Sequence, residues 1–263
     1  MDISKVIAQE LGIREKQVAA VMELLDEGAT IPFIARYRKE ATGGLDDVTL
    51  RTLSERLDYL TRLEARKAEV SATIQEQSAL TADLAKQIAE AQTLQRVEDL
   101  YKPFKKSRAT RASKAREAGL TPLAELLLAQ KPSPCDPLTE AARFAKPDTA
   151  YADAQAALQG ACDIVAEMVA DDPDATEELR GFVQRTGQLT ARAASEDAER
   201  DFASYVDFSE SLARVPSHRI LALNRGEAEG KLRVSVSVDG EEALDRLERR
   251  FVRGQSPWRE ALE

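Results

Sequence analysis

The chain has 263 residues, of which 43% are hydrophobic, 32% charged and 5% aromatic, and its formal net charge is −9. This balance predicts an all-α protein with one large core or two small ones, and it disfavours a β-rich fold. No apolar run approaches the roughly 20 residues that a membrane span needs, and the first residues, MDISKVIAQELG, do not resemble a signal peptide. We therefore expect a cytoplasmic protein with no membrane contact.

Two short helices are expected at the N-terminus, one ending at Gly12 and one starting near Arg14. A third, cationic helix is predicted within ATIPFIARYRKEATGGLDD, residues 29–47. Thr30 suits its N-cap, Pro32 suits its first turn, and Gly43-Gly44 suits its end. Its apolar residues are expected to face the core; they are Phe33, Ile34 and Tyr37.

The opposite side of this third helix carries Arg36, Arg38 and Lys39. As the second helix of a helix-turn-helix arrangement, it would present these cations to the major groove of DNA. The plainer alternative is an ordinary αα-hairpin in which Arg36 pairs with Glu40 four residues on. The sequence leaves both alternatives open.

Leucines spaced by three and four residues predict a long helix from about Asp47 to Gln77, capped by Asp46 or Asp47. The spacing is typical of a coiled-coil seam. The apolar stripe weakens after Leu63, however, so we expect this helix to pack within its own domain rather than to form a dimer.

A basic segment spans residues 102–116 and contains no acidic residue. Its seven cations are Lys102, Lys105, Lys106, Arg108, Arg111, Lys114 and Arg116. Cations in a loop can follow phosphates, and the adjacent Tyr101 and Phe104 offer stacking surfaces. We expect any nucleic-acid affinity of the chain to lie here and to tolerate any base sequence. The alternative is a solvated loop, or one that the surrounding acids neutralise.

The rest of the sequence is predicted to form a second helical region. We expect an N-terminal domain over residues 1–130, a linker over 131–149 and a second helical segment over 150–263. Strict alternation predicts a short β element from Lys231 to Val238. Because a single strand needs a partner, and the last residues resemble the opening of another helix, we expect the sequence to be part of a longer chain.

No set of residues typical of an enzyme is found. His218 is the only histidine, which excludes a histidine-rich metal site, and no nucleophile with its base can be assembled. The loop Gly226–Lys231 differs from a phosphate loop in its spacing and in its two glutamates. We expect no catalysis, no metal and no cofactor.

Three strings appear together in one order: the stretch over 29–47, the residues Val97–Phe104 with the basic segment after them, and PSHRILALNRGEAEG over Pro216–Gly230. In this the chain resembles the N-terminal region of the Tex family of bacterial transcription accessory proteins. The resemblance implies RNA or DNA binding without sequence specificity, association with the transcription machinery, and contact with downstream domains, among them an OB-fold domain that is the family's main RNA-binding element. A helical protein–protein interaction scaffold with no nucleic-acid affinity of its own is the alternative.

Overall fold

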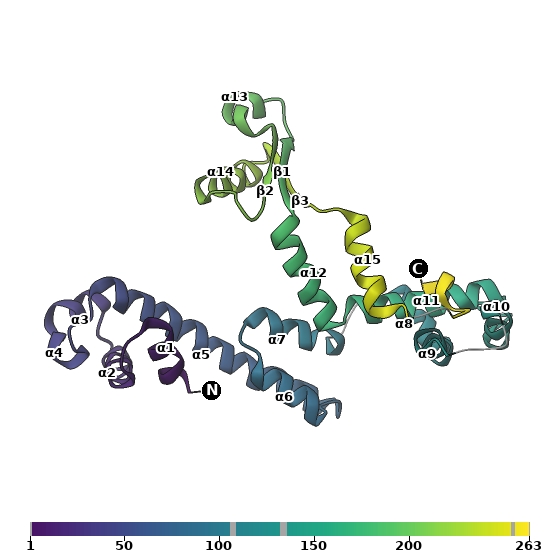
Figure 1. Ribbon diagram of the computed structural model, residues 1–263, viewed down its shortest axis with the longest axis horizontal. Coiled ribbons are helices and arrows are strands. Elements are labelled where there is room, and N and C mark those ends of the chain that lie inside the picture. Colours follow the sequence, from purple (N-terminus) through teal and green to yellow (C-terminus); the bar gives the residue numbers. More distant parts are fainter. Residues whose placement is uncertain (1, 106–108, 132–135, 254–255, 263) are drawn as a thin grey trace. The chain divides into compact units, whose positions relative to one another are not determined.

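The computed structural model describes residues 2–105, 109–131, 136–253 and 256–262. The chain divides into two compact units, Met1–Lys105 (unit 1) and Lys106–Glu263 (unit 2). Helices dominate both units, and one small three-stranded sheet lies in unit 2 (Figure 1). This confirms the predicted all-α fold class with a short β element. None of the helices in the described ranges is long and apolar enough to cross a membrane.

Unit 1 is built on one long helix. Its elements are α1 (Ile3–Leu11), α2 (Glu15–Asp26), α3 (Ile31–Tyr37), α4 (Lys39–Thr42), α5 (Asp47–Glu76), α6 (Ala82–Glu90), α7 (Leu94–Tyr101) and the 3₁₀ turn Lys102–Phe104. As predicted, α5 begins after Asp46, whose side chain accepts a hydrogen bond from the Thr49 backbone N–H. Helices α1, α3, α6 and α7 all contact α5 (Figure 1).

The apolar stripe of α5 faces the core of unit 1 along its whole length. Leu50, Leu53, Leu60 and Leu63 are buried in one cluster with residues of α1, α2, α3, α6 and α7. The stripe continues through Lys67, whose buried ammonium donates to the Ala89 carbonyl and pairs with Glu64. The expectation that α5 packs within its own domain is thus confirmed, and a satisfied lysine fills the position where the stripe weakens.

Unit 2 contains a helical cluster and the sheet. Its helices are α8 (Arg111–Glu117), α9 (Thr121–Ala129), α10 (Pro137–Ala141), α11 (Ala154–Ala170), α12 (Pro173–Thr186), α13 (Ala198–Phe202), α14 (Ser217–Ala228), α15 (Gly240–Phe251) and α16 (Arg259–Leu262), with 3₁₀ turns at Ala142–Phe144 and Ala203–Tyr205. Helices α8, α9 and α10 pack on α11, and Leu120, Leu123 and Ala161 are buried in their shared core.

The division between the units lies earlier than the boundary predicted after residue 130. Gln130 shows why, because its amide group donates to the Phe251 carbonyl and accepts from the Arg253 backbone N–H, both at 2.6 Å. These bonds tie the end of α9 to the end of α15 inside unit 2. Part of the predicted linker also forms α10.

The sheet has the order β2-β1-β3 and is antiparallel throughout. Its strands are β1 (Gln188–Ala193), β2 (Asp207–Ser211) and β3 (Leu232–Ser237). Strand β3 was predicted, whereas β1 and β2 were not. Leu189, Ala191 and Leu232 form a small core with Phe202 of α13 and Leu223 of α14. Thr190, in the row paired with Ser209 and Ser235, is outside that cluster.

Candidate nucleic-acid interface

Helix α3 is held to unit 1 by a narrow apolar face. Thr30 is its N-cap residue and Pro32 lies in its first turn, as predicted. Ile34 is fully buried, and Ile31 and Ala35 pack beside it against the core. These three residues follow the i, i+3, i+4 spacing of one helix face. The face is complete without Phe33 or Tyr37.

The aromatic residues of α3 point away from the core. Phe33 is 40% exposed and Tyr37 is 67% exposed, so the prediction that both rings are buried is wrong. Phe33 precedes Ile34 by one residue, which turns it by about 100° from the buried face. Being four residues apart, the two rings lie on one side of the helix, with centroids 5.3 Å apart.

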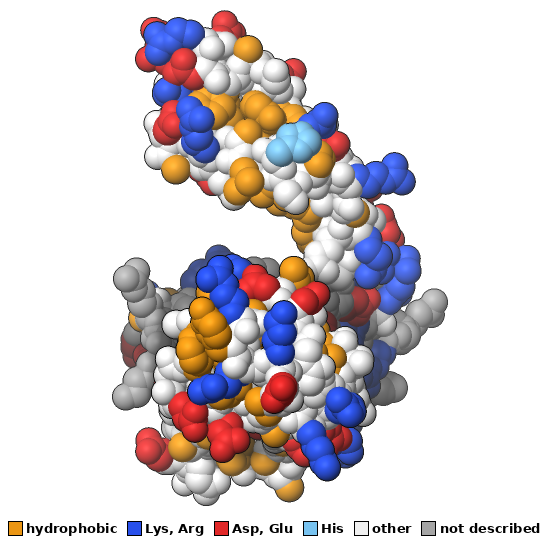
Figure 2. Space-filling view, turned by 90° about the vertical axis from the view of Figure 1, so that its left-hand side faces the viewer, with side chains coloured by type: hydrophobic (Ala, Val, Ile, Leu, Met, Phe, Trp, Pro, Cys, Tyr) orange, Lys and Arg blue, Asp and Glu red, His pale blue; other side chains and the backbone are white. Residues whose placement is uncertain are grey.

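Three cations adjoin the two rings. Arg36, Arg38 and Lys39 are exposed, and none has a carboxylate within ion-pair distance among the described residues. The Arg36–Glu40 pair that the αα-hairpin alternative allowed is therefore not formed. The Arg38 guanidinium lies 5.3 Å from the centroid of the Phe33 ring. We call the set Phe33, Arg36, Tyr37, Arg38 and Lys39 the α3 patch; Figure 2 looks onto this end of unit 1, where hydrophobic and basic side chains adjoin.

The predicted single helix is two helices, because the chain leaves helical geometry at Arg38 (φ −124°, ψ 26°). The short α4 then ends at Gly43, which has the left-handed φ of +64° that glycine tolerates. The Gln17 side chain donates to the Thr42 carbonyl at 2.8 Å and fixes α4 against α2. A Cβ on Gly43 would lie 2.8 Å from the Gln17 amide nitrogen. Helix α4, which begins with Lys39 of the α3 patch, is thus held against α2.

The part of the basic segment that lies in unit 1 is engaged with its own surroundings. Lys105 pairs with Glu98 of α7 and lies 5.4 Å from the Tyr101 ring centroid. Lys102 is not free either. Arg66 of α5 also binds Glu98, at 2.6 Å, and hydrogen bonds from Arg66 and then Lys105 lower the pKa of that carboxyl. The acid thus stays ionised and holds Lys105.

In unit 2 the last residues of the basic segment lie in α8 (Arg111–Glu117). Arg116 pairs with Glu167 of α11, and Arg111 lies 3.5 Å from Asp163 of the same helix. Burial acts to raise the pKa of Glu167, but hydrogen bonds from Arg116 and Thr110 outweigh it and the pKa is lowered. Lys114 is exposed with no ion pair among described residues. Lys106 and Arg108 lie outside the described residues.

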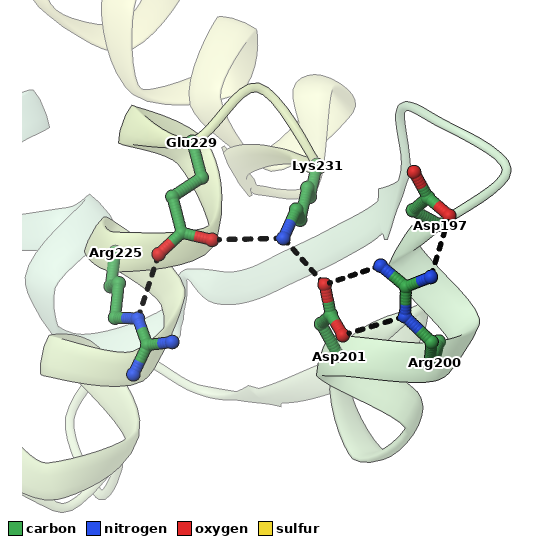
Figure 3. A network of polar contacts seen from close by, with 6 residues as sticks. All are labelled: Asp197, Arg200, Asp201, Arg225, Glu229 and Lys231. Atoms are coloured by element: carbon green, nitrogen blue, oxygen red, sulfur yellow. Dashed lines mark hydrogen bonds and ion pairs between the residues drawn. The ribbon is translucent and has the colours of Figure 1, made fainter.

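A further group of charges lies in the sheet region of unit 2, within and beside the string Pro216–Gly230 (Figure 3). Lys231 binds Asp201 of α13 and also Glu229, the latter at 3.1 Å. Glu229 in turn accepts from Arg225 at 2.8 Å. Lys231 and Arg225 also lie over the ring of Phe202. Each charge has an opposite partner, so this network holds α13, α14 and the start of β3 together.

Acid titration is expected to show how this network works. Hydrogen bonds from Arg200 and then Lys231 lower the pKa of Asp201 from 3.8 to about 2. Because the folded pKa lies below the unfolded value, the contribution to stability is present above about pH 4 and lost as pH falls through about 2. We expect carbon NMR to give an Asp201 pKa near that low value, and a higher one in Lys231→Gln. Arg233→Gln is the control and should leave the Asp201 pKa unchanged. If Lys231→Gln also leaves that pKa unchanged, the contact between Lys231 and Asp201 is contradicted.

The described residues hold no group of three or more histidine, cysteine or acidic side chains that could bind a metal ion. Structure and sequence instead define a mostly helical protein with an exposed aromatic and cationic patch. A family model described as Tex-like protein N-terminal domain matches residues 1–75, which include that patch. A second, described as Tex central region-like, matches residues 133–256. The chain belongs to the Tex family.

Relatives support this membership. Protein tex of Bordetella pertussis is 49% identical over 247 residues, which is 92% of this chain and 31% of that protein. Transcriptional accessory protein Tex of Neisseria gonorrhoeae is 44% identical over 238 residues, 90% of this chain and 31% of that protein. S1 RNA-binding domain-containing protein 1 of Homo sapiens is 28% identical over 247 residues, 90% of this chain and 24% of that protein. The chain thus spans less than a third of these relatives.

Proposed function

We propose that this chain contributes to nucleic-acid binding, with RNA as its first ligand, within a transcription accessory protein, and that the α3 patch makes the contact. Its role is to bind and position rather than to catalyse a reaction. Association with the transcription machinery is part of the proposal, since a relative is named a transcriptional accessory protein. RNA is preferred over DNA because another relative is named for an S1 RNA-binding domain.

One observation carries the proposal: the cations of the α3 patch have no acidic partner in the described structure, whereas most described cations of the basic segment do. A cation already paired with a carboxylate must give up that pair to bind a phosphate, and an unpaired one need not. The chain as a whole has a net charge of −9, so a polyanion is repelled by its surface outside the basic regions. We therefore prefer the α3 patch as the nucleic-acid-binding site over residues 102–116, the site that the sequence alone favours.

The proposal predicts the salt dependence of RNA binding. Three phosphate contacts to a single strand give a slope of log K against log salt of about −2, at about −0.7 per contact. Changing Arg36, Arg38 and Lys39 together to glutamine should remove most of that slope and lower affinity at low salt at least tenfold. Fluorescence anisotropy with a labelled RNA of mixed sequence, at several salt concentrations, measures both quantities.

The matched control removes the same charge elsewhere. Lys102, Lys105 and Lys114 changed together to glutamine should reduce affinity much less. If this control abolishes binding and the α3 variant does not, the interface lies in the basic segment. If the parent chain binds no RNA or DNA at low salt, the helical protein-interaction scaffold replaces the proposal.

A further inference from the structure

We propose that Tyr37 is a stacking site for an unpaired nucleobase, with Phe33 and Arg38 supporting its ring. This inference rests on the proposed function and adds the part of the nucleic acid that is recognised: an unpaired base in addition to the phosphates. It rests on the exposure of the two rings and on the contact between them. Phosphate binding by the cations of the α3 patch requires neither of these features.

Neither ring belongs to the hydrophobic core of unit 1. A buried aromatic side chain removes about 150–250 Å² of surface from water, and such residues dominate cores and interfaces. Tyr37 keeps two thirds of its surface in solvent and Phe33 keeps 40%. The nearby Ile34 already anchors the helix with its side chain fully buried. The fold therefore leaves Tyr37 unused.

Geometry assigns the base to Tyr37 rather than to Phe33. The two ring planes are inclined by 46°, so one stack of parallel bases cannot lie flat on both rings. Phe33 is the less exposed ring, and it already lies near the Arg38 guanidinium at 5.3 Å. Tyr37 has no cation over its ring among the described residues, and one side of it contacts Phe33. A base stacked on Tyr37 would follow a row of contacts in which Arg38 lies over Phe33 and Phe33 contacts Tyr37.

The surroundings favour a nucleic acid over a protein partner. Aromatic residues and arginine are common in protein–protein interfaces, whereas lysine and a surplus of one sign of charge are not. Here Lys39 joins Arg36 and Arg38, and none of the three has a carboxylate partner in the described part of the chain, as a polyanion site requires. Single-stranded nucleic-acid sites combine such cations with aromatic rings, because every base has a face that can stack. Arg36 and Lys39 lie on either side of Tyr37 in sequence and are placed to meet phosphates next to the stacked base.

The test separates stacking from phosphate contact by using one strand of RNA and a duplex of the same length. In a duplex the faces of the bases are covered by their neighbours. Tyr37→Leu keeps an apolar side chain and removes the ring, and it should weaken single-stranded RNA binding about tenfold while leaving duplex binding unchanged. Phe33→Leu should have a smaller effect in the same direction. Val48→Ala, an exposed apolar residue of unit 1 outside the patch, is the control and should change neither.

A fluorescence signal gives a readout that does not depend on affinity. The only tryptophan, Trp258, is buried in unit 2. Tyr37→Trp adds an exposed indole, whose emission should be quenched when single-stranded RNA saturates the protein, while the parent's emission stays constant. If RNA binds but Tyr37→Leu binds both ligands as the parent does, and Tyr37→Trp is not quenched, stacking is refuted and the phosphate contacts stand. If neither RNA form binds the parent, the proposed function and this inference fall together.

Discussion

Ile34→Ala should lower the free energy of unfolding of unit 1 by roughly 2–5 kcal/mol, the range for truncating a large aliphatic side chain in a core. Phe33→Ala, one residue earlier, should cost far less, because Phe33 is 40% exposed whereas Ile34 is fully buried. Urea unfolding followed by circular dichroism measures both variants. Trp258 fluorescence reports unit 2 separately, since unit 1 contains no tryptophan.

The opposite order of the two losses, Phe33→Ala above Ile34→Ala, would contradict the orientation of α3. A large loss in Phe33→Ala, with little change in Ile34→Ala, would mean that α3 is rotated about its axis and that Phe33 faces the core. Such a result would remove Phe33 from the α3 patch and with it the support assigned to the Tyr37 ring. Leu53→Ala, a fully buried truncation in α5, provides the reference for a core substitution in the same unit.

Helix α5 was predictable because several independent signals agree over thirty residues. Asp46 caps the helix, the apolar stripe repeats for many turns, and a long stripe of this kind has one face to bury. Lys67 weakened the signal, because the sequence gives no sign that the Ala89 carbonyl is near enough to accept a hydrogen bond from its ammonium group. That partner comes from another helix, α6, and depends on the tertiary fold.

Strands β1 and β2 escaped prediction for a different reason. In β1 only Leu189 and Ala191 are buried, and alanine has little β preference; in β2 Phe208 is the only hydrophobic residue. These two strands form because they pair with a neighbour and not because of their own β preference: Thr190 of β1 is aligned with Ser209 of β2 on one side and Ser235 of β3 on the other. Only β3 has enough alternating valines to be recognised alone.

The candidate site was half predicted. The cations of the α3 patch were named from the sequence, but its aromatic residues were placed in the core, because the sequence of α3 contains two apolar faces and only one can be buried. Ile31, Ile34 and Ala35 follow the i, i+3, i+4 spacing of one helix face and already provide the face that packs on the core. This spacing was the signal in the sequence that could have placed Phe33 and Tyr37 at the surface. The acids that engage Lys105 and Arg116 lie 7 and 51 residues away, and the second of these distances is beyond any local pattern.

Gly226→Ala is the second substitution expected to have a large effect, and it tests why this glycine stands in the string Pro216–Gly230. A Cβ there would lie 2.5 Å from Leu232 Cδ1, 2.8 Å from Leu232 Cγ and 3.2 Å from Phe202 Cε1. Both neighbours are buried in the small core under the sheet, so neither can move aside freely. We expect a loss of about 1–3 kcal/mol, the usual cost of overpacking, even though alanine favours a helix over glycine.

Gly181→Ala in α12 is the matched control, because the exchange is the same, both residues lie inside helices of unit 2, and the nearest atom to the added Cβ, at 3.1 Å, is the end of the flexible Arg185 side chain. There the helix preference of alanine acts alone and should stabilise by up to about 1 kcal/mol. The difference between the two variants isolates the packing at Gly226, since the helix preference is common to both. Amide hydrogen exchange of β1, the central strand, should rise in Gly226→Ala only. Equal stabilisation in both variants would show that α14 can move away from β3, and the tight contact would then not be what requires glycine at position 226.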